Sequence, residues 1–179
     1  MVASLVALPG AVSGQSAMAE APAACRVALA AVAAGELAAF AGLPPGCTEA
    51  DAAASFGAPR PGEGEASLGT DHVSARYRVH ATARGTFAVH VVGGALVLIT
   101  SEDVQLTGAW ESALGKPDGR LDVALGRGTS LKGAESVWAS KGVAAIRSST
   151  GALLQLALFS PTTVARYRSA LRPSHAVRR

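Results

Sequence analysis

Large aromatic side chains are scarce in this chain of 179 residues. Phenylalanine, tryptophan and tyrosine make up 4% of it, whereas hydrophobic residues of all kinds make up 49%. Much of that apolar share is alanine, so large rings cannot fill the core. Protein interiors are close-packed whatever their composition. The sequence therefore predicts a core in which backbones approach one another closely.

An excess of charge of one sign is also missing. The 16 Lys and Arg residues nearly balance 13 Asp and Glu residues, and the formal net charge is +3. This composition lacks the dense basic surface of a nucleic-acid-binding domain. No stretch reaches the ~18–20 uninterrupted apolar residues of a membrane span. The nearest, 24–40, contains Arg26, Gly35 and Glu36. We expect neither a nucleic-acid partner nor a transmembrane segment.

No recognisable catalytic or cofactor motif is present. The chain has no Gly-x-Ser-x-Gly element and no conspicuous carboxylate pair, and the glycine loop at 126–128 is incomplete. Two of the four histidines, His80 and His90, should lie close together on adjacent strands. They have no nearby Cys, Asp or Glu to complete a metal shell. We therefore expect no catalytic residue, no cofactor and no metal site.

The first 22 residues are apolar and rich in small side chains. Ala17-Met18-Ala19 has the small-x-small form of a signal-peptidase site, although no Lys or Arg precedes Arg26. A secretory signal peptide and a disordered tail both fit this segment. Export would make the protein secreted or periplasmic.

Only two cysteines are present, and they flank an alanine-rich helix expected over 23–43. Cys25 lies at its start and Cys47 just after its end. In an exported protein the two would form a disulfide; two unpaired cysteines are the alternative. A helix of ~17 residues is ~25 Å long, so pairing needs a late helix start or a loop that folds back.

Several landmarks recur at a nearly constant interval. Gly142 follows Gly85 by 57 positions, Gly151 follows Gly94 by 57, and Gly115 follows Gly57 by 58. This order indicates a tandem duplication, with repeat one at 44–104, repeat two at 105–161, and a basic helix and tail at 162–179. We expect turns or helix stops at six glycines: Gly57, Gly85, Gly94, Gly115, Gly142 and Gly151.

Each repeat should contain a short helix followed by strands. Thr48 and Thr107 are the expected N-caps. Alternating apolar residues predict strands over 72–82, 86–92, 95–100, 135–140, 143–148 and 152–159. A three-residue turn, Ala83-Arg84-Gly85, would set Val79 opposite Val89 and so keep one face apolar. The predicted fold class is α+β, with two tandem repeats of a short helix plus an antiparallel three- or four-stranded meander and helices on one face.

This arrangement resembles the secreted β-lactamase inhibitor proteins, and each half is similar to the small outer-membrane assembly lipoproteins of the SmpA/OmlA type. The matching motifs are Gly46-Cys47-Thr48, then Phe56-Gly57-Ala58-Pro59, and again Leu114-Gly115-Lys116-Pro117. The resemblance spans about 46–161. It implies a sheet face that binds another protein and performs no catalysis.

One cationic outer face is predicted on the first repeat. In the register above, Arg78 faces His90, and Arg76 and His80 point to the same side. Such a face would suit an acidic protein partner or an anion, although an ordinary solvated face is the alternative. Trp138 is either a core residue or a binding hot spot.

The sequence as a whole favours an exported, non-enzymatic protein-binding module of the inhibitor or envelope-adaptor type. Two alternatives stay open: a small enzyme or ligand-binding domain whose site is not visible in sequence, and an envelope structural protein. A closed cleft with converging polar groups would favour an enzyme, and an open, partly apolar sheet face would favour a protein-binding module.

Overall fold

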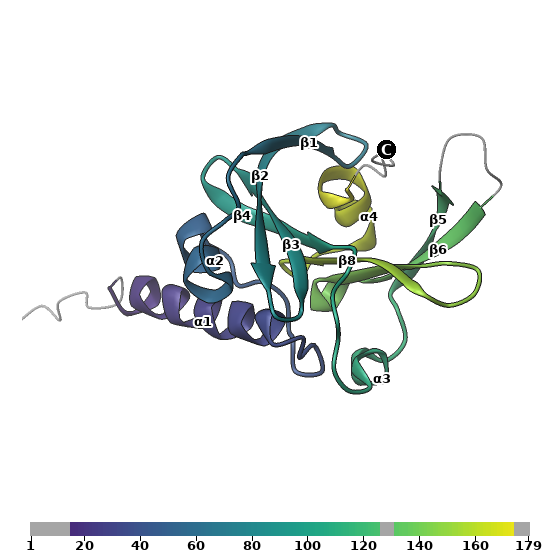
Figure 1. Ribbon diagram of the computed structural model, residues 1–179, viewed down its shortest axis with the longest axis horizontal. Coiled ribbons are helices and arrows are strands. Elements are labelled where there is room, and N and C mark those ends of the chain that lie inside the picture. The colour runs from purple at the N-terminus through teal and green to yellow at the C-terminus, as the bar shows by residue number, and fades with distance from the viewer. Residues whose placement is uncertain (1–14, 126–130, 174–179) are drawn as a thin grey trace, which may run out of the picture.

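A computed structural model describes residues 15–125 and 131–173 (Figure 1). The protein is α+β, with one antiparallel sheet of eight strands in the order β1-β2-β3-β4-β8-β7-β6-β5. The strands are β1 (Gly64–Leu68), β2 (Val73–Thr82), β3 (Gly85–Val92), β4 (Ala95–Ser101), β5 (Gly119–Leu125), β6 (Leu131–Trp138), β7 (Val143–Arg147) and β8 (Leu153–Phe159). The helices are α1 (Gln15–Ala33), α2 (Glu49–Phe56), α3 (Trp110–Leu114) and α4 (Val164–Arg166), which continues as a π-helical turn, η2 (Tyr167–Leu171); η1 (Ala139–Lys141) is a 3₁₀ turn.

The sheet consists of two four-stranded meanders that meet at β4 and β8. Leu98 lies opposite Phe159 and Thr100 opposite Ala157 across this central pair. A short helix precedes each meander, α2 before β1 and α3 before β5. The sequence interpretation missed the outermost strands, β1 and β5. That the two halves are copies of one ancestral unit stays a prediction.

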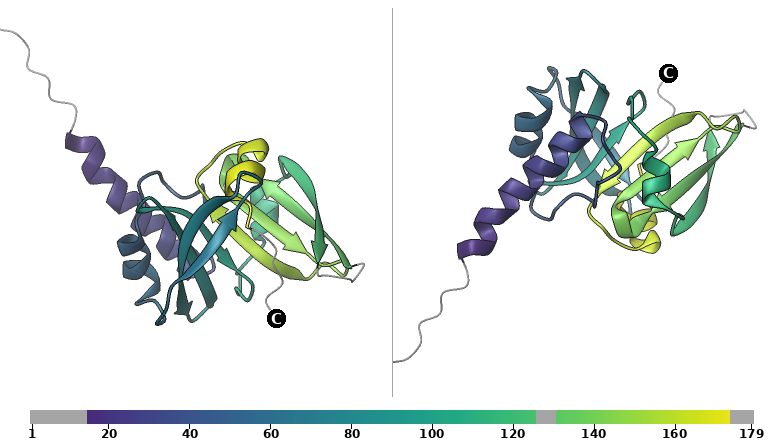
Figure 2. Two further views of the ribbon diagram at one scale, coloured as in Figure 1. Left: turned by 90° about the horizontal axis from the view of Figure 1, so that it is seen from above. Right: turned by 90° about the horizontal axis from the view of Figure 1, so that it is seen from below.

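Helices cover both faces of the sheet (Figure 2). The buried residues of α1, α2 and α3 share one cluster with Phe87, Val89 and Leu158 of the sheet. Tyr167 of the C-terminal helix packs on the opposite face, where its ring stacks on Phe159 at 4.6 Å. The expectation of helices on one face therefore does not extend to the last helix. In the described ranges no helix is long and apolar enough to cross a membrane.

The turn between β2 and β3 has two residues, Ala83-Arg84. Thr82 pairs with Gly85, and Val79 pairs with Ala88. The predicted three-residue turn is wrong by one position. Because side chains alternate along a strand, this single step changes which β3 side chains share a face with those of β2.

The reason lies in the two-sided covering of the sheet. Phe87 and Val89 point toward α2, whereas Ala75 of β2 joins the cluster on the other face. The apolar residues of β2 and β3 thus serve opposite faces. Arg78 faces Val89 rather than His90.

Helix α1 ends at Ala33, about ten residues earlier than expected. Gly35, with φ +74°, lies just beyond it, and the chain turns back on itself. This return brings Cys47 to Cys25, with Cα atoms 5.5 Å apart, and the predicted disulfide is confirmed. The choice between signal peptide and tail falls mainly on residues 1–14, which lie outside the described ranges.

The two short helices begin differently. Thr48 caps α2, as predicted. The Asp51 amide donates to Thr48 Oγ1 and the Thr48 amide donates to Asp51 Oδ2, so the two residues form a capping box. Thr107 does not cap α3. Its hydroxyl donates instead to the Gly35 carbonyl oxygen at 3.2 Å, and α3 starts after Ala109 without a side-chain cap. All six predicted turn glycines have positive φ.

The C-terminal helix contacts β1 at one end of the sheet. The Gly69 amide donates to the Arg172 carbonyl oxygen at 2.7 Å, and Leu68 forms an antiparallel bridge with Pro173. The helix lies between the two ends of the curved sheet, on the face opposite α1 (Figures 1 and 2). It therefore occupies part of a face that would otherwise be open.

The same helix contacts β6 and β5 at the other end of the sheet. Tyr167 Oη donates to Glu135 Oε1 at 2.5 Å, and Arg172 Nε donates to Glu135 Oε2 at 2.7 Å. Arg172 also donates to the Asp122 carbonyl oxygen at 2.9 Å. Burial, reinforced by the Glu135 carboxylate, raises the pKa of Tyr167. Glu135 itself is buried, so each of its oxygens needs these partners.

Candidate functional site

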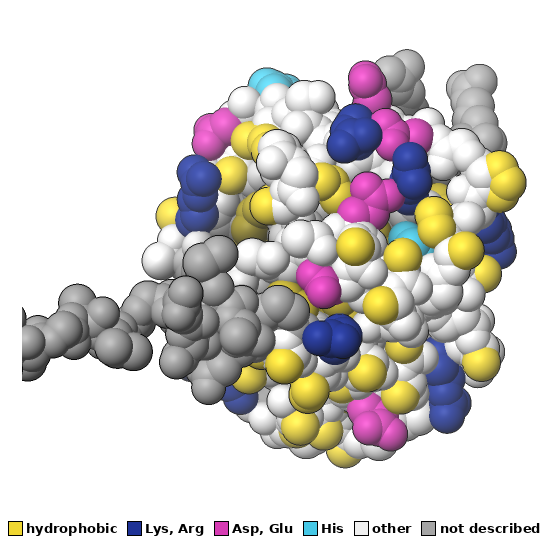
Figure 3. Space-filling view, turned by 90° about the vertical axis from the view of Figure 1, so that its left-hand side faces the viewer, with side chains coloured by type: hydrophobic (Ala, Val, Ile, Leu, Met, Phe, Trp, Pro, Cys, Tyr) yellow, Lys and Arg dark blue, Asp and Glu magenta, His cyan; other side chains and the backbone are white. Residues whose placement is uncertain are grey.

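The two arginines of the predicted cationic face are neutralised by neighbouring carboxylates. Arg76 pairs with Glu63 at 3.1 Å, and Arg78 pairs with Glu49 at 3.1 Å and with Glu63 at 3.3 Å. Hydrogen bonds from Arg76 lower the pKa of Glu63. On the side of the molecule nearest α1 and α2, basic and acidic side chains alternate and form no large patch of one sign (Figure 3).

The two histidines of that predicted face lie on opposite sides of the sheet. His80 is fully buried beneath α2, where its Nδ1 lies 2.8 Å from the Gly57 carbonyl oxygen and its ring meets Phe56 edge-on. His90 pairs with Tyr77 on the other side. The prediction of one shared cationic face is therefore wrong, because it rested on the incorrect register.

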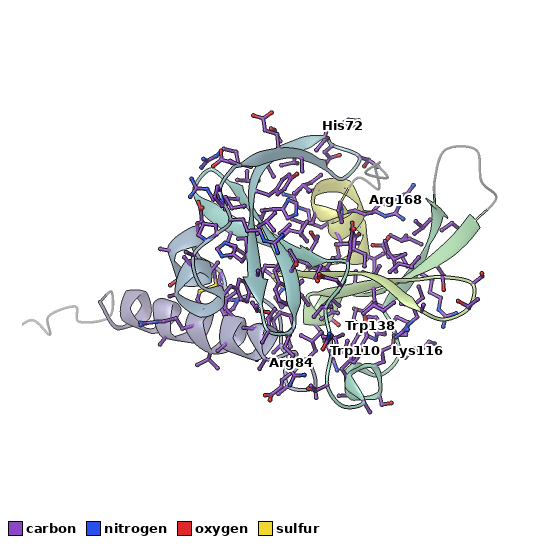
Figure 4. The ribbon with its side chains drawn as sticks, viewed as in Figure 1. His72, Arg84, Trp110, Lys116, Trp138 and Arg168 are labelled. Carbon is purple, nitrogen blue, oxygen red and sulfur yellow. A yellow bond between two sulfur atoms is a disulfide. The ribbon has the colours of Figure 1, made fainter. Side chains whose placement is uncertain are left out.

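Trp138 belongs to the core. It is 4% exposed, its ring meets that of Trp110 edge-on at 6.0 Å, and its Nε1 donates to the Gly115 carbonyl oxygen at 2.7 Å. Figure 4 shows the two tryptophans together beside α3. Of the two interpretations of Trp138, this environment favours the core residue.

The face of the sheet opposite α1 and α2 has a partly open hollow of about 730 Å³ beside the end of the C-terminal helix. We call it the sheet hollow. Strands β2, β3, β4 and β8 contribute its floor, β1 forms a wall, and Pro173 borders it at the end of the C-terminal helix. The floor residues used below are Tyr77, Ala88, His90, Thr100 and Gln155.

His90 is the central polar group of the sheet hollow. It is 5% exposed, and its Nε2 lies 3.1 Å from Thr100 Oγ1. Its Nδ1 is buried and has no partner within the described part of the chain. Burial lowers the pKa of His90 from 6.5 to about 4, so the ring is neutral at pH 7. A buried polar atom without a hydrogen bond costs about 1–3 kcal/mol, so this one needs an explanation.

A second unpartnered acceptor borders the same hollow. Gln155 Oε1 on β8 is buried and makes no hydrogen bond to any other described residue. Across the floor, the pairing of β3 with β4 shifts between His90 and Val91. Such bulges re-aim side chains and are frequent beside binding sites. Two unsatisfied polar atoms and a bulge thus coincide at one hollow.

The rim of the sheet hollow is acidic. Among the described residues, Glu65, Glu102 and Asp103 line it together with one basic residue, Arg60. Burial acts to raise the pKa of Asp103, but hydrogen bonds from Thr86 and other neighbours outweigh it and lower that pKa. Asp103 is therefore ionised at neutral pH, and the described lining of the hollow has more acidic than basic side chains.

A Ser–His pair lies at the edge of this site. Ser67 Oγ lies 3.2 Å from His72 Nδ1, with Ser67 on β1 and His72 in the turn that follows. In the described residues no carboxylate hydrogen-bonds to His72, so the third member of a catalytic triad is missing. Over the same ranges, no group of three or more His, Cys, Asp or Glu residues could hold a metal ion.

The sequence interpretation missed Tyr77, Thr100 and Gln155, and it placed His90 in a different environment. Thr100 follows the apolar run 95–99, and Gln155 interrupts the apolar run 152–159. A polar residue within an apolar strand is a usable signal, because burial of its side chain requires a partner. The strand order needed to bring β3, β4 and β8 together could not be read from the sequence.

Comparison with protein-family models, with curated proteins and with solved structures finds no match for this chain.

Proposed function

We propose that this chain is an exported, non-enzymatic binding protein that holds a small polar ligand in the sheet hollow. The observation that carries the proposal is His90, which lines a hollow of about 730 Å³ and whose buried Nδ1 has no partner among the described residues. Sites for organic ligands commonly measure about 300–1,000 Å³ and contain a few placed polar groups. A bound ligand would supply the missing hydrogen bond. The Cys25–Cys47 disulfide supports export.

A small ligand suits this face better than a broad protein surface does. The C-terminal helix already covers part of the face through Tyr167 and Phe159. The accessible part is concave and has polar groups at its floor. The sequence left open whether the protein binds another protein or a small ligand, and this geometry favours the small ligand.

A protein partner is the second candidate, and the position of β1 favours it. This strand is the outermost one at one end of the sheet, and it lines the sheet hollow. An outer strand can pair with an extended segment of another protein. The partner would then add a strand beside Ala66 and place one side chain in the hollow.

The experiment compares a blocked hollow with an unblocked one. Ala88→Trp fills the floor, and Ala54→Trp, on an exposed position of α2 that does not line the hollow, is the control. We expect hits from a thermal-shift screen of small polar molecules to raise the Tm of the wild type and of Ala54→Trp, but not of Ala88→Trp. Ala66→Trp blocks the wall if Ala88→Trp does not fold.

Two results would count against a small-ligand site. One is a screen in which no molecule raises the Tm of the wild type. The other is a set of hits that stabilise Ala88→Trp as strongly as Ala54→Trp. In either case, a peptide whose binding is lost on Ala66→Pro, which disrupts the pairing of β1, would favour the protein partner.

The finer description of the fold, as two duplicated units, is also proposed here. It is supported by the helix, the Gly-x-Pro stop and the four-stranded meander that occur in each half. The test is whether residues 48–101 superpose on 109–159 in an experimental structure, strand for strand. A different strand order in the two halves would refute it.

A further inference from the structure

The ligand can be described more closely from the groups that would meet it, given the binding role proposed above. Two floor residues each have a buried side-chain atom that makes no hydrogen bond within the described part of the chain, and both atoms are acceptors when the neutral His90 ring carries its proton on Nε2 and donates it to Thr100. Gln155 Oε1 is an acceptor, and His90 Nδ1 then is one too. A ligand that satisfies them must donate hydrogen bonds.

The charge of the rim selects the sign of the ligand. In the part of the chain that the structure describes, the sheet hollow is lined by three carboxylate residues, Glu65, Glu102 and Asp103, and by one guanidinium, that of Arg60. An excess of carboxylates on the walls of a concave site attracts cations and repels anions. The donors that satisfy the floor are therefore best carried by a positively charged group.

An aromatic ring completes the site. Tyr77 lines the sheet hollow, and its ring lies 5.3 Å from that of His90. The face of a tyrosine ring attracts a cation placed within about 6 Å. Because His90 Nδ1 and Gln155 Oε1 are both buried, a ligand reaches them only after neighbouring side chains move.

We infer that the sheet hollow binds a compact organic cation with N–H donors, of the amine, amidine or guanidine class. The buried acceptors at the floor, the acidic rim and the Tyr77 ring all favour this class. A neutral molecule of the same shape could donate hydrogen bonds to the floor residues but would lack the attraction to the acidic rim. A carboxylate would be repelled by the rim.

Three probes of one shape test this inference by calorimetric titration of the full chain. Benzamidine is a cation with N–H donors, benzamide is its neutral counterpart, and benzoate is the anion. We expect benzamidine to bind about tenfold or more tightly than benzamide, because hydrogen bonds from charged groups are the strong ones. Benzoate should not bind measurably.

Two conservative variants locate the effect. Gln155→Leu removes an acceptor and should weaken benzamidine about tenfold or more. Glu102→Gln removes one rim charge and should weaken it a few-fold, whereas Glu36→Gln, on an exposed residue that does not line the hollow, should leave it unchanged. The ¹⁵N signal of His90 Nδ1 should report an unprotonated nitrogen in the free protein and shift on binding.

The outcomes separate this inference from the proposed function. Ligands that bind the wild type but not Ala88→Trp, and that prove to be neutral or anionic, would overturn the inference that the ligand is a cation. The proposed binding role would remain intact. A protonated Nδ1 in the free protein would also overturn the inference. Benzamidine that binds Ala88→Trp as tightly as wild type would contradict both.

Discussion

Gly142 provides the sharpest test of close backbone packing. It has φ +66° and ψ +33°, the left-handed conformation, and follows the turn η1. A Cβ atom at this position would overlap the Phe159 carbonyl oxygen and lie 2.9 Å from Gly42 Cα. That carbonyl accepts a hydrogen bond from the Leu43 amide at 3.0 Å. Gly142→Ala must therefore displace a bonded carbonyl as well as adopt a strained backbone.

The expected cost follows from these two effects. The left-handed conformation costs an L-residue about 1–2 kcal/mol, and a weakened hydrogen bond adds about 0.5–1.5 kcal/mol. Gly142→Ala should lower the free energy of unfolding by about 1.5–3.5 kcal/mol, measured by urea denaturation followed by far-UV circular dichroism.

Gly151→Ala is the matched control. It has φ +86°, but a Cβ there meets nothing within 4 Å, so only the conformational cost of about 1–2 kcal/mol applies. Any stabilisation through the unfolded chain is common to both variants and cancels in the comparison. Equal losses in the two variants would refute the argument that the Gly142 backbone is packed against Phe159.

Three other predictions concern buried groups. The first concerns His90. Between pH 6.5 and about 4 the unfolded ring binds a proton that the folded ring does not. The free energy of unfolding should therefore be about 2 kcal/mol lower at pH 5 than above pH 6.5 because of this residue. His90→Gln should lose less stability at pH 5 than the wild type does, and equal pH profiles for the two proteins would contradict the buried, neutral state of His90. Replacing Cys25 and Cys47 by alanine should cost about 3 kcal/mol for a closed loop of this length, and mass spectrometry of protein alkylated in the cell should find the two linked; alkylated thiols would contradict the expected export. Glu135→Leu should lower the free energy of unfolding by about 3–5 kcal/mol and expose the C-terminal helix to limited proteolysis, because it leaves Arg172 without its carboxylate. A variant as stable as the wild type would show that Glu135 does not hold this helix on the sheet.

Local chemistry made part of the fold predictable. The capping box of Thr48 and Asp51, and the positive φ of glycines such as Gly57, depend on residues a few positions apart. The strands and two-residue turn at Gly93-Gly94 follow from alternation and from the conformational freedom of glycine. The disulfide required only that the chain return after Ala33.

Long-range packing decided the rest. The register of β2 and β3 depends on which face of the sheet each apolar side chain packs on. Apolar side chains can pack on the second face because the C-terminal helix, which is far along the sequence, covers it. The sequence prediction assumed that one face was buried, and it therefore paired Arg78 with His90. The binding hollow also needs Gln155 and Thr100 on neighbouring strands, which only the pairing of β4 with β8 provides. The sequence marks each of them as a polar residue beside or within an apolar run, but it does not show that the two lie on neighbouring strands.

The bridge from Leu68 to Pro173 has a consequence for how the chain is made. The first strand of the sheet finds one of its partners only when nearly the last described residue has left the ribosome. Until then, one edge of β4 in the N-terminal half of the sheet is unpaired, because its neighbour β8 has not yet been synthesised. An uncovered edge is prone to pair with other chains. Slow emergence of the C-terminal third should therefore favour misassembly, and a delay before that segment should lower the yield more than the same delay before α2.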